Sequence, residues 1–421
     1  MRTIFCKKDA VIFGGVLLNL CCLFLPSFSD AIPIYEKTSF YDKASFSVQT
    51  NTPSKKRRDP FQRPSLLNDS EDASLGLSLR LNHLEGGKFV VPFQNGLKTV
   101  YTLSPSLQLG MKDYFQKNKV PYGVFVAMDP HTGKILALVE HSSKEPRAKN
   151  LALRATYPAA SIFKLITASA ALEEKQAGPE TELERNRSSN TTLADAFAHS
   201  DNRAFSEVAL RYLNIKTLLG YANRFQFNRK IPFELPIQVS KIRAEDSRAG
   251  LANLAAGFGD VGLSPLHGAL IGSAIANDGV MVAPCLIERV VSSSGKTILE
   301  CTPKVFATAI SAKTAAQLRQ MMGLTVTKGT AQKAFKTAWK EPALRAISMG
   351  GKTGSLTGNN PAGKVTWFIG MAPLENPEIV ISALIVNKPK YWKIKASNVA
   401  KEGFRTYFNA KRNVRLASKQ S

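Results

Sequence analysis

The stretch YPAASIFKLITASAAL, residues 157–172, brings a serine and a lysine together at the start of an apolar segment. Residues 157–160 form a predicted loop, and the apolar run after it predicts a buried helix. Ser161 then lies at a helix N-terminus, where free N–H groups favour a developing negative charge. Lys164 lies one turn further along the same face, so its amine can reach the serine hydroxyl. A helix-capping serine beside an ordinary lysine has the same spacing, as Ser293 and Lys296 show within a turn.

Two further motifs follow in a fixed order. Ser200-Asp201-Asn202 comes after a short helical run, where a helix-capping role is the alternative. Gly350-Gly351-Lys352-Thr353-Gly354-Ser355 precedes a predicted strand at Thr366–Met371, and its glycines would let a ligand lie against the backbone. A phosphate-binding loop differs from residues 346–353 only at its first glycine. We reject that loop because residues 356–361 end in proline and cannot easily form the helix that should follow.

The order of these three motifs is the signature of serine β-lactamases and penicillin-binding proteins. Similarity to the transpeptidase domain of penicillin-binding proteins extends from about residue 100 to 386, and several shorter stretches carry it: residues 103–108, 129–138, 200–205, 256–277, 329–331 and 366–370. The resemblance implies an α+β fold of the β-lactamase/transpeptidase type. In that fold an antiparallel sheet flanked by helices meets an all-helical lobe, and the active site lies between them.

The resemblance also implies roles for the motif residues. Ser161 would attack the substrate carbonyl, and Lys164 would act as its base, which requires a neutral amine. Lowering a lysine pKa from about 10.4 to about 7 costs roughly 4–5 kcal/mol. Burial and the like charge of Lys352 are the expected sources of that shift.

The remaining motif residues would bind substrate and move protons. Ser200 would relay the proton to the leaving amine, and Asn202 would hold the substrate amide or Lys164. Lys352 and Thr353 would bind the terminal carboxylate, with Gly354 and Ser355 on the same strand. The backbone N–H groups of Ser161 and Ser355 would form the oxyanion hole. The scheme needs no metal and no cofactor, and the five histidines show no metal-binding spacing.

Peptidoglycan D,D-transpeptidase, acylated by D-Ala-D-Ala stem peptides and by β-lactams, is the favoured activity. A D,D-carboxypeptidase would use the same residues and stays open. A class A β-lactamase is disfavoured, because no E-x-x-L-N run occurs between Arg203 and Gly351, and class D enzymes generally have an apolar residue where Asn202 stands. A β-lactam-sensing module is a further alternative, but it would need a signalling partner coupled through the membrane.

The chain divides into four predicted parts. Residues 1–31 have a basic start and an apolar run, which predict a signal peptide or a membrane anchor. A lipoprotein is less favoured, because Leu20 is bulky where a small residue is expected before Cys21. A flexible polar and basic linker is predicted at 32–85, the transpeptidase domain at 86–412 and a tail at 413–421. This organisation favours the periplasm or the outer face of the cytoplasmic membrane.

Strands are predicted near both ends of the domain, at residues 89–91, 99–103, 124–128, 134–139 and 379–386, with a mainly helical middle and a last helix at 396–407. A hairpin at 286–299 is flanked by Cys285 and Cys301, for which a cross-strand disulfide and two buried thiols are equally open. Before residue 86 we expect no room for a glycosyltransferase domain and little for a pedestal domain, which leaves open whether the domain docks on partners.

The net charge of +24 in 421 residues bears on partners. In an exported protein it favours anionic lipid headgroups or wall polymers over nucleic acid. The basic run at residues 55–58 lies in the polar linker, where a solvated segment is the alternative. Other cell-wall synthesis proteins are further candidate partners.

Overall fold

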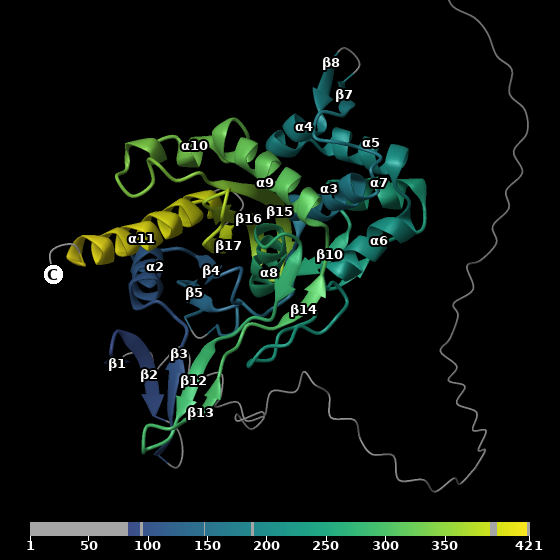
Figure 1. The fold of residues 1–421 in the computed structure, drawn as a ribbon. Helices are drawn as coiled ribbons and strands as arrows, with labels where there is room; N and C mark the ends of the chain where they lie inside the picture. The colour runs from purple at the N-terminus through teal and green to yellow at the C-terminus, as the bar shows by residue number, and fades with distance from the viewer. Residues whose placement is uncertain (1–82, 93–95, 147, 187–188, 388–393, 419–421) are drawn as a thin grey trace, which may run out of the picture. The chain divides into compact units, whose positions relative to one another are not determined.

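The computed structural model describes residues 83–92, 96–146, 148–186, 189–387 and 394–418. The predicted export segment and almost all of the predicted linker lie outside these residues. The central element is an antiparallel sheet with the strand order β15-β16-β17-β4-β5 (Figure 1). Its strands are β4 Tyr122–Met128, β5 Ile135–Ser142, β15 Gly350–Asn359, β16 Ala362–Ala372 and β17 Ile379–Asn387. The prediction that N- and C-terminal segments share one sheet is therefore confirmed.

Both faces of this sheet are buried, and alternate side chains supply the two hydrophobic cores. On β4, Val124 and Val126 belong to one core, whereas Phe125 and Ala127 belong to the other. Because successive strand residues point to opposite faces, a nearly continuous apolar run serves both cores. The fully buried pattern of β17, IVISALIVN, has the same cause.

Helices cover the two faces differently. The face that carries Phe125 packs against α2 Pro105–Lys117 and α11 Ala396–Ala417, which also contact each other (Figure 1). The opposite face packs against α8 Pro265–Ala276, all of whose residues are buried. Cβ atoms added at Gly268 or Gly272 would come within 2.8 Å of sheet side chains, so these glycines allow α8 to approach the sheet closely.

A mainly helical lobe lies beside the sheet, as the middle of the sequence predicts, although it also contains short strands where the resemblance implied an all-helical lobe. Its helices are α3 Lys164–Glu173, α4 Leu193–His199, α5 Asn202–Tyr212, α6 Ile215–Arg224 and α7 Arg248–Ala256. The helix α9 Ala312–Thr327 contacts both α3 and α4 in the lobe and β15 in the sheet. Short strands complete this region: β6 Tyr157–Pro158, β7 Glu182–Asn186, β8 Ser189–Thr192, β9 Ile242–Arg243 and β10 Asp260–Leu263.

A second five-stranded sheet has the order β1-β2-β3-β12-β13 (Figure 1). Its strands are β1 Leu84–Glu85, β2 Lys88–Pro92, β3 Lys98–Tyr101, β12 Ile287–Val291 and β13 Thr297–Glu300. A separate pair is formed by β11 Val280–Val282 and β14 Val305–Thr308. The structure joins Cys285 and Cys301, which flank the hairpin β12–β13, by a disulfide.

Two boundaries differ from the sequence prediction. The strand β1 begins at Leu84, just before the expected domain start, because it pairs with β2. Helix α11 continues to Ala417, well past the expected end near Tyr407. Its last buried residue is Phe408, so the final turns lack the apolar periodicity on which the prediction rested. Among the described residues, no helix combines the length and apolarity of a membrane span.

Candidate active site

Ser161 lies in a tight turn that precedes a buried helix. The turn is the 3-10 helix η2 Ala160–Phe163, and α3 continues directly from it. Every residue of α3 from Lys164 to Leu172 is buried, which confirms the predicted buried helix. Ala160 has a φ of +50°, in the region that non-glycine residues rarely adopt. Such backbone strain is found where the surrounding structure holds a residue in place, often at functional sites.

Lys164 is fully buried and directly bonded to the serine. Its Nζ donates to Ser161 Oγ at 2.9 Å, to Asn202 Oδ1 at 2.7 Å and to the carbonyl oxygen of Ala256 at 2.6 Å. Burial lowers the pKa of Lys164 to about 7, and the charge of Asp201 opposes this shift. The site therefore holds an amine that can be neutral near physiological pH, already within reach of a hydroxyl.

The second lysine is also buried. Lys352 Nζ donates to Ser200 Oγ at 2.8 Å and to the carbonyl oxygen of Thr353 at 3.0 Å. Burial, and then the charge of Lys164, hold the pKa of Lys352 well below its usual range. We expected the charge of Lys352 to help lower the pKa of Lys164. Instead, burial lowers the Lys164 pKa, and the charge of Lys164 contributes to lowering the pKa of Lys352.

Local backbone structure explains the placement of the second motif. Ser200 ends α4 in the left-handed conformation, with φ 59° and ψ 40°. Asp201 is then the N-cap of α5 and accepts from the N–H groups of Arg203 and Ala204. The helix-capping alternative therefore holds for Asp201, while Ser200 and Asn202 each contact one of the two lysines.

The third motif lies on β15, which is an edge strand of the central sheet. Edge strands leave one row of backbone groups free for a ligand. The register pairs Lys352 with Ile369 and Gly354 with Trp367 on β16. A Cβ atom at Gly354 would lie 3.1–3.3 Å from Ile162 and Ala159, so the glycine lets β15 pack against the turn that carries Ser161. Ser355, the next residue, is exposed.

Several contacts were missed by sequence reasoning. Thr330, after α9, shares a hydrogen bond of 2.5 Å with Thr353 Oγ1. Its only sequence signal was the family-like segment 329–331. The ring of Phe205 lies 5.6 Å from Lys164 Nζ, and the ring of Phe197 lies 5.5 Å from Lys352 Nζ. These rings exclude water while offering each lysine a polarisable face.

A prediction concerns Gly257, which follows the carbonyl of Ala256 at the end of α7. Its φ is +92°, and an added Cβ would lie 2.4 Å from the oxygen of Ala160 and 2.9 Å from the nitrogen of Ser161. We expect Gly257→Ala to lower the free energy of unfolding by at least about 2 kcal/mol and to slow acylation of Ser161. Thermal unfolding and labelling with a fluorescent penicillin measure the two effects.

The matched control is Gly220→Ala. Gly220 lies inside α6 with open space around its Cβ position, so alanine there should stabilise the protein by about 0.5–1 kcal/mol. If Gly257→Ala behaved like this control in both measurements, the turn would not be fixed by close backbone contact.

The edge strand, the buried helix and the two lysines form the arrangement of the β-lactamase/transpeptidase-like fold. Comparison with known proteins agrees. The penicillin binding protein transpeptidase domain family matches residues 123–405. The D,D-transpeptidase domain of a peptidoglycan glycosyltransferase from Eggerthella lenta has a TM-score of 0.63 at 26% identity, over 74% of this chain and 83% of that one. Penicillin-binding protein A from M. tuberculosis, as an imipenem acyl-enzyme complex, shares the fold with a TM-score of 0.64 at 23% identity, over 73% and 78%.

Curated relatives give the same result. The peptidoglycan D,D-transpeptidase PbpA of Mycolicibacterium smegmatis is 28% identical in an alignment 335 positions long, which covers 68% of this chain and 66% of that protein. Stage V sporulation protein D of Bacillus subtilis is 25% identical in an alignment 330 positions long, which covers 70% of this chain and 50% of that protein. The chain thus spans 66% or less of the length of these two relatives. It belongs to the penicillin-binding protein transpeptidase domain family, as the motifs predict.

Proposed function

We propose that this protein is a peptidoglycan D,D-transpeptidase that is acylated at Ser161 by D-Ala-D-Ala stem peptides and by β-lactams. One observation carries the proposal: a fully buried lysine with a pKa lowered to about 7 donates to the hydroxyl of Ser161 at 2.9 Å. Among similar proteins, several are named as D,D-transpeptidases.

In the acylation step, neutral Lys164 takes the proton of Ser161 as the serine oxygen bonds to the penultimate D-Ala carbonyl carbon. The carbonyl oxygen becomes an oxyanion, which the backbone N–H groups of Ser161 and Ser355 would stabilise. The C–N bond then breaks, and the departing D-Ala amine receives, through Ser200, the proton that Lys164 took. An acceptor amine next attacks the acyl-enzyme and gives a proton to Lys164, and Lys164 returns a proton to the oxygen of Ser161 as the ester C–O bond breaks.

The terminal carboxylate of the donor would lie against Thr353, Thr330 and Lys352. These groups converge: Thr330 bonds Thr353, and Lys352 bonds both Ser200 and the Thr353 carbonyl. An arriving carboxylate favours the charged form of a neighbouring lysine. Substrate binding would therefore raise the pKa of Lys352 and help to keep Lys164 neutral, since the two amines repel each other when both are charged.

We further propose that the protein acts in the periplasm or on the outer face of the cytoplasmic membrane, where its substrate is. The basic and apolar start of the sequence and the disulfide between Cys285 and Cys301 support this location. The net charge of +24 supports anionic membrane or wall polymers as proposed partners. Other cell-wall synthesis proteins are further proposed partners.

The decisive experiment labels the purified protein with a fluorescent penicillin, maps the adduct by mass spectrometry and follows its loss with time. We expect one adduct, on the peptide that contains Ser161, persisting for minutes to hours. Release within seconds would indicate a β-lactamase instead. A folded protein without an adduct would contradict the proposal.

Transpeptidation and carboxypeptidation differ in the attacking group. A synthetic stem pentapeptide is therefore incubated with the enzyme, with and without an acceptor amine. We expect a cross-linked product at the expense of the hydrolysed tetrapeptide. Hydrolysis alone at every acceptor concentration would assign the protein as a D,D-carboxypeptidase.

The role of Ser200 gives a separate prediction. Ser200→Ala and Ser200→Gly both remove the hydroxyl that bonds Lys352, so each should slow acylation by about 10²–10⁴-fold. Only glycine tolerates the left-handed backbone without strain, so Ser200→Ala should be less stable than Ser200→Gly by about 1 kcal/mol. Rapid acylation in either variant would exclude Ser200 from proton transfer.

A further inference from the structure

The segment between α9 and β15 carries a cluster of exposed cations around an exposed tryptophan. It contains α10 Gln332–Phe335 and the 3-10 helix η3 Ala338–Lys340. Trp339 has 66% of its surface exposed, and Lys340 Nζ lies 5.1 Å from the centre of its ring. Between residues 332 and 345, the other exposed cations are Lys333, Lys336 and Arg345. We call these five residues the basic-tryptophan patch.

The helical backbone presents these residues together. The two residues between α10 and η3 also have right-handed helical dihedrals, so the chain follows a nearly continuous helical path. Positions three, six and seven residues after Lys333 then lie on the same side, and they are Lys336, Trp339 and Lys340. The opposite side is buried through Phe335 and Ala338.

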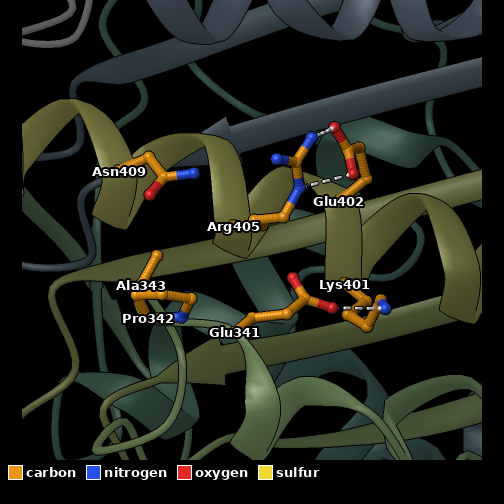
Figure 2. A pocket seen from close by; sticks show the side chains of 7 residues that line it. All are labelled: Glu341, Pro342, Ala343, Lys401, Glu402, Arg405 and Asn409. Atoms are coloured by element: carbon orange, nitrogen blue, oxygen red, sulfur yellow. Dashed lines mark hydrogen bonds and ion pairs between the residues drawn. The ribbon is translucent and has the colours of Figure 1, made fainter.

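The patch is held firmly against the domain. The ring of Phe335 stacks on Phe368 of β16 at 5.5 Å. Lys401 of α11 donates to Glu341 at 2.8 Å and to Thr337 at 3.2 Å, and thereby fixes the segment on both sides of Trp339. Figure 2 shows the Glu341–Lys401 pair at this junction. The exposed tryptophan therefore lies on a segment that is anchored both to the central sheet and to α11.

The adjoining cavity in Figure 2, about 390 Å³ in volume, does not explain the patch. Its two cations are both engaged by carboxylates: Lys401 by Glu341 and Arg405 by Glu402. By contrast, none of the four patch cations takes part in an ion pair recorded among the described residues. Positive charge is thus concentrated on the outer surface around Trp339.

We propose that the basic-tryptophan patch binds the headgroup region of an anionic phospholipid bilayer. Lysines and arginines close to an anionic membrane each contribute about 1 kcal/mol of attraction, and an indole ring favours the boundary between headgroups and acyl chains. A soluble polyanion would need the cations but not an exposed tryptophan. This contact is additional to the proposed transpeptidase activity and would fix the orientation of the domain on the membrane.

The test uses the full chain with Trp392→Phe, which leaves two tryptophans, Trp339 and the buried Trp367. Fluorescence is measured with liposomes that contain brominated phosphatidylcholine, with or without phosphatidylglycerol. We expect strong quenching only with phosphatidylglycerol, and its loss in high salt. In the triple variant Lys333→Glu, Lys336→Glu, Lys340→Glu, half-maximal quenching should need at least about tenfold more lipid.

A charge-matched control separates the patch from the general positive charge. The control replaces three exposed lysines elsewhere, Lys241, Lys296 and Lys313, by glutamate. The fluorescence of the control variant should be quenched like that of the parent protein, and penicillin labelling should be unchanged in both triple variants. Equal loss of quenching in the control variant would overturn the proposal. Quenching of the same strength with and without phosphatidylglycerol would also overturn it. Displacement of the liposomes by polyphosphate at equal phosphate concentration would also overturn it, by assigning the patch to a soluble polyanion.

Discussion

Replacing Ser161 by alanine is expected to abolish covalent labelling by penicillin. The variant removes the hydroxyl oxygen in the turn η2 to which Lys164 Nζ donates at 2.9 Å, and with it the proposed nucleophile. Loss of an enzyme's nucleophile lowers the rate by at least about 10⁴-fold. Labelling is measured by fluorescence after electrophoresis, over hours and at saturating penicillin. The fold should be retained, because the Ser161 side chain is a small and partly exposed group.

The chain supplies a matched control for this variant. Ser293 precedes Lys296 with the same spacing, but both residues lie in the exposed turn between β12 and β13. Ser293→Ala should label like the parent protein. Labelling that survives in Ser161→Ala would contradict the assignment of the nucleophile and would require another serine at the site.

Replacing Lys164 by methionine should lower the rate of acylation by about 10²–10⁴-fold, the usual contribution of a general base. Lys164→Arg should be equally impaired, since a guanidinium remains charged and cannot take a proton. In the parent protein the rate should rise with pH through about 7 and then level, because burial lowers the Lys164 pKa to that value. Stopped-flow acylation between pH 5.5 and 9 measures the profile, and an unchanged rate in Lys164→Met would contradict the proposed base.

The same shift predicts how stability depends on pH. The pKa of Lys164 is about 7 in the folded protein and 10.5 for an exposed lysine, so between these values the unfolded chain binds more protons. The contribution of Lys164 to the free energy of unfolding therefore rises with pH across that window. The destabilisation caused by burying the charged amine is largest below pH 7. Lys164→Met removes this destabilisation but leaves the oxygens of Asn202 and Ala256 without the donor that Lys164 supplies.

Comparison of unfolding at two pH values tests this balance. Relative to the parent protein, Lys164→Met should be more stable at pH 6 than at pH 9.5. The difference arises because only the parent protein gains stability as Lys164 loses its proton on folding. Chemical denaturation at both pH values provides the measurement. The absence of a difference between the two pH values would mean that Lys164 stays charged in the folded protein throughout this range.

Local sequence patterns determined much of the fold. The apolar segment after Ser161 predicted a buried helix, and apolar runs near both ends of the domain predicted the strands of one sheet. These predictions are possible because a buried helix or strand needs apolar residues in a pattern that can be read from the local sequence. The ends of elements were less predictable. The last turns of α11 are exposed, and β1 depends on pairing with β2, so neither boundary has a local apolar signal.

The candidate site was predicted as a list of residues, whereas tertiary structure decided their relations. The resemblance left open whether Asn202 would hold the substrate or Lys164, and the structure shows the bond to Lys164. Nothing in the sequence indicated that Lys164 would also bond the Ala256 carbonyl, or that Thr330 would bond Thr353. These contacts join segments far apart in the chain, so they depend on how the helical lobe packs against β15. The pKa values of the two lysines have the same origin: residue type sets the ordinary value, but exclusion of water by the packed lobe and sheet sets the shift.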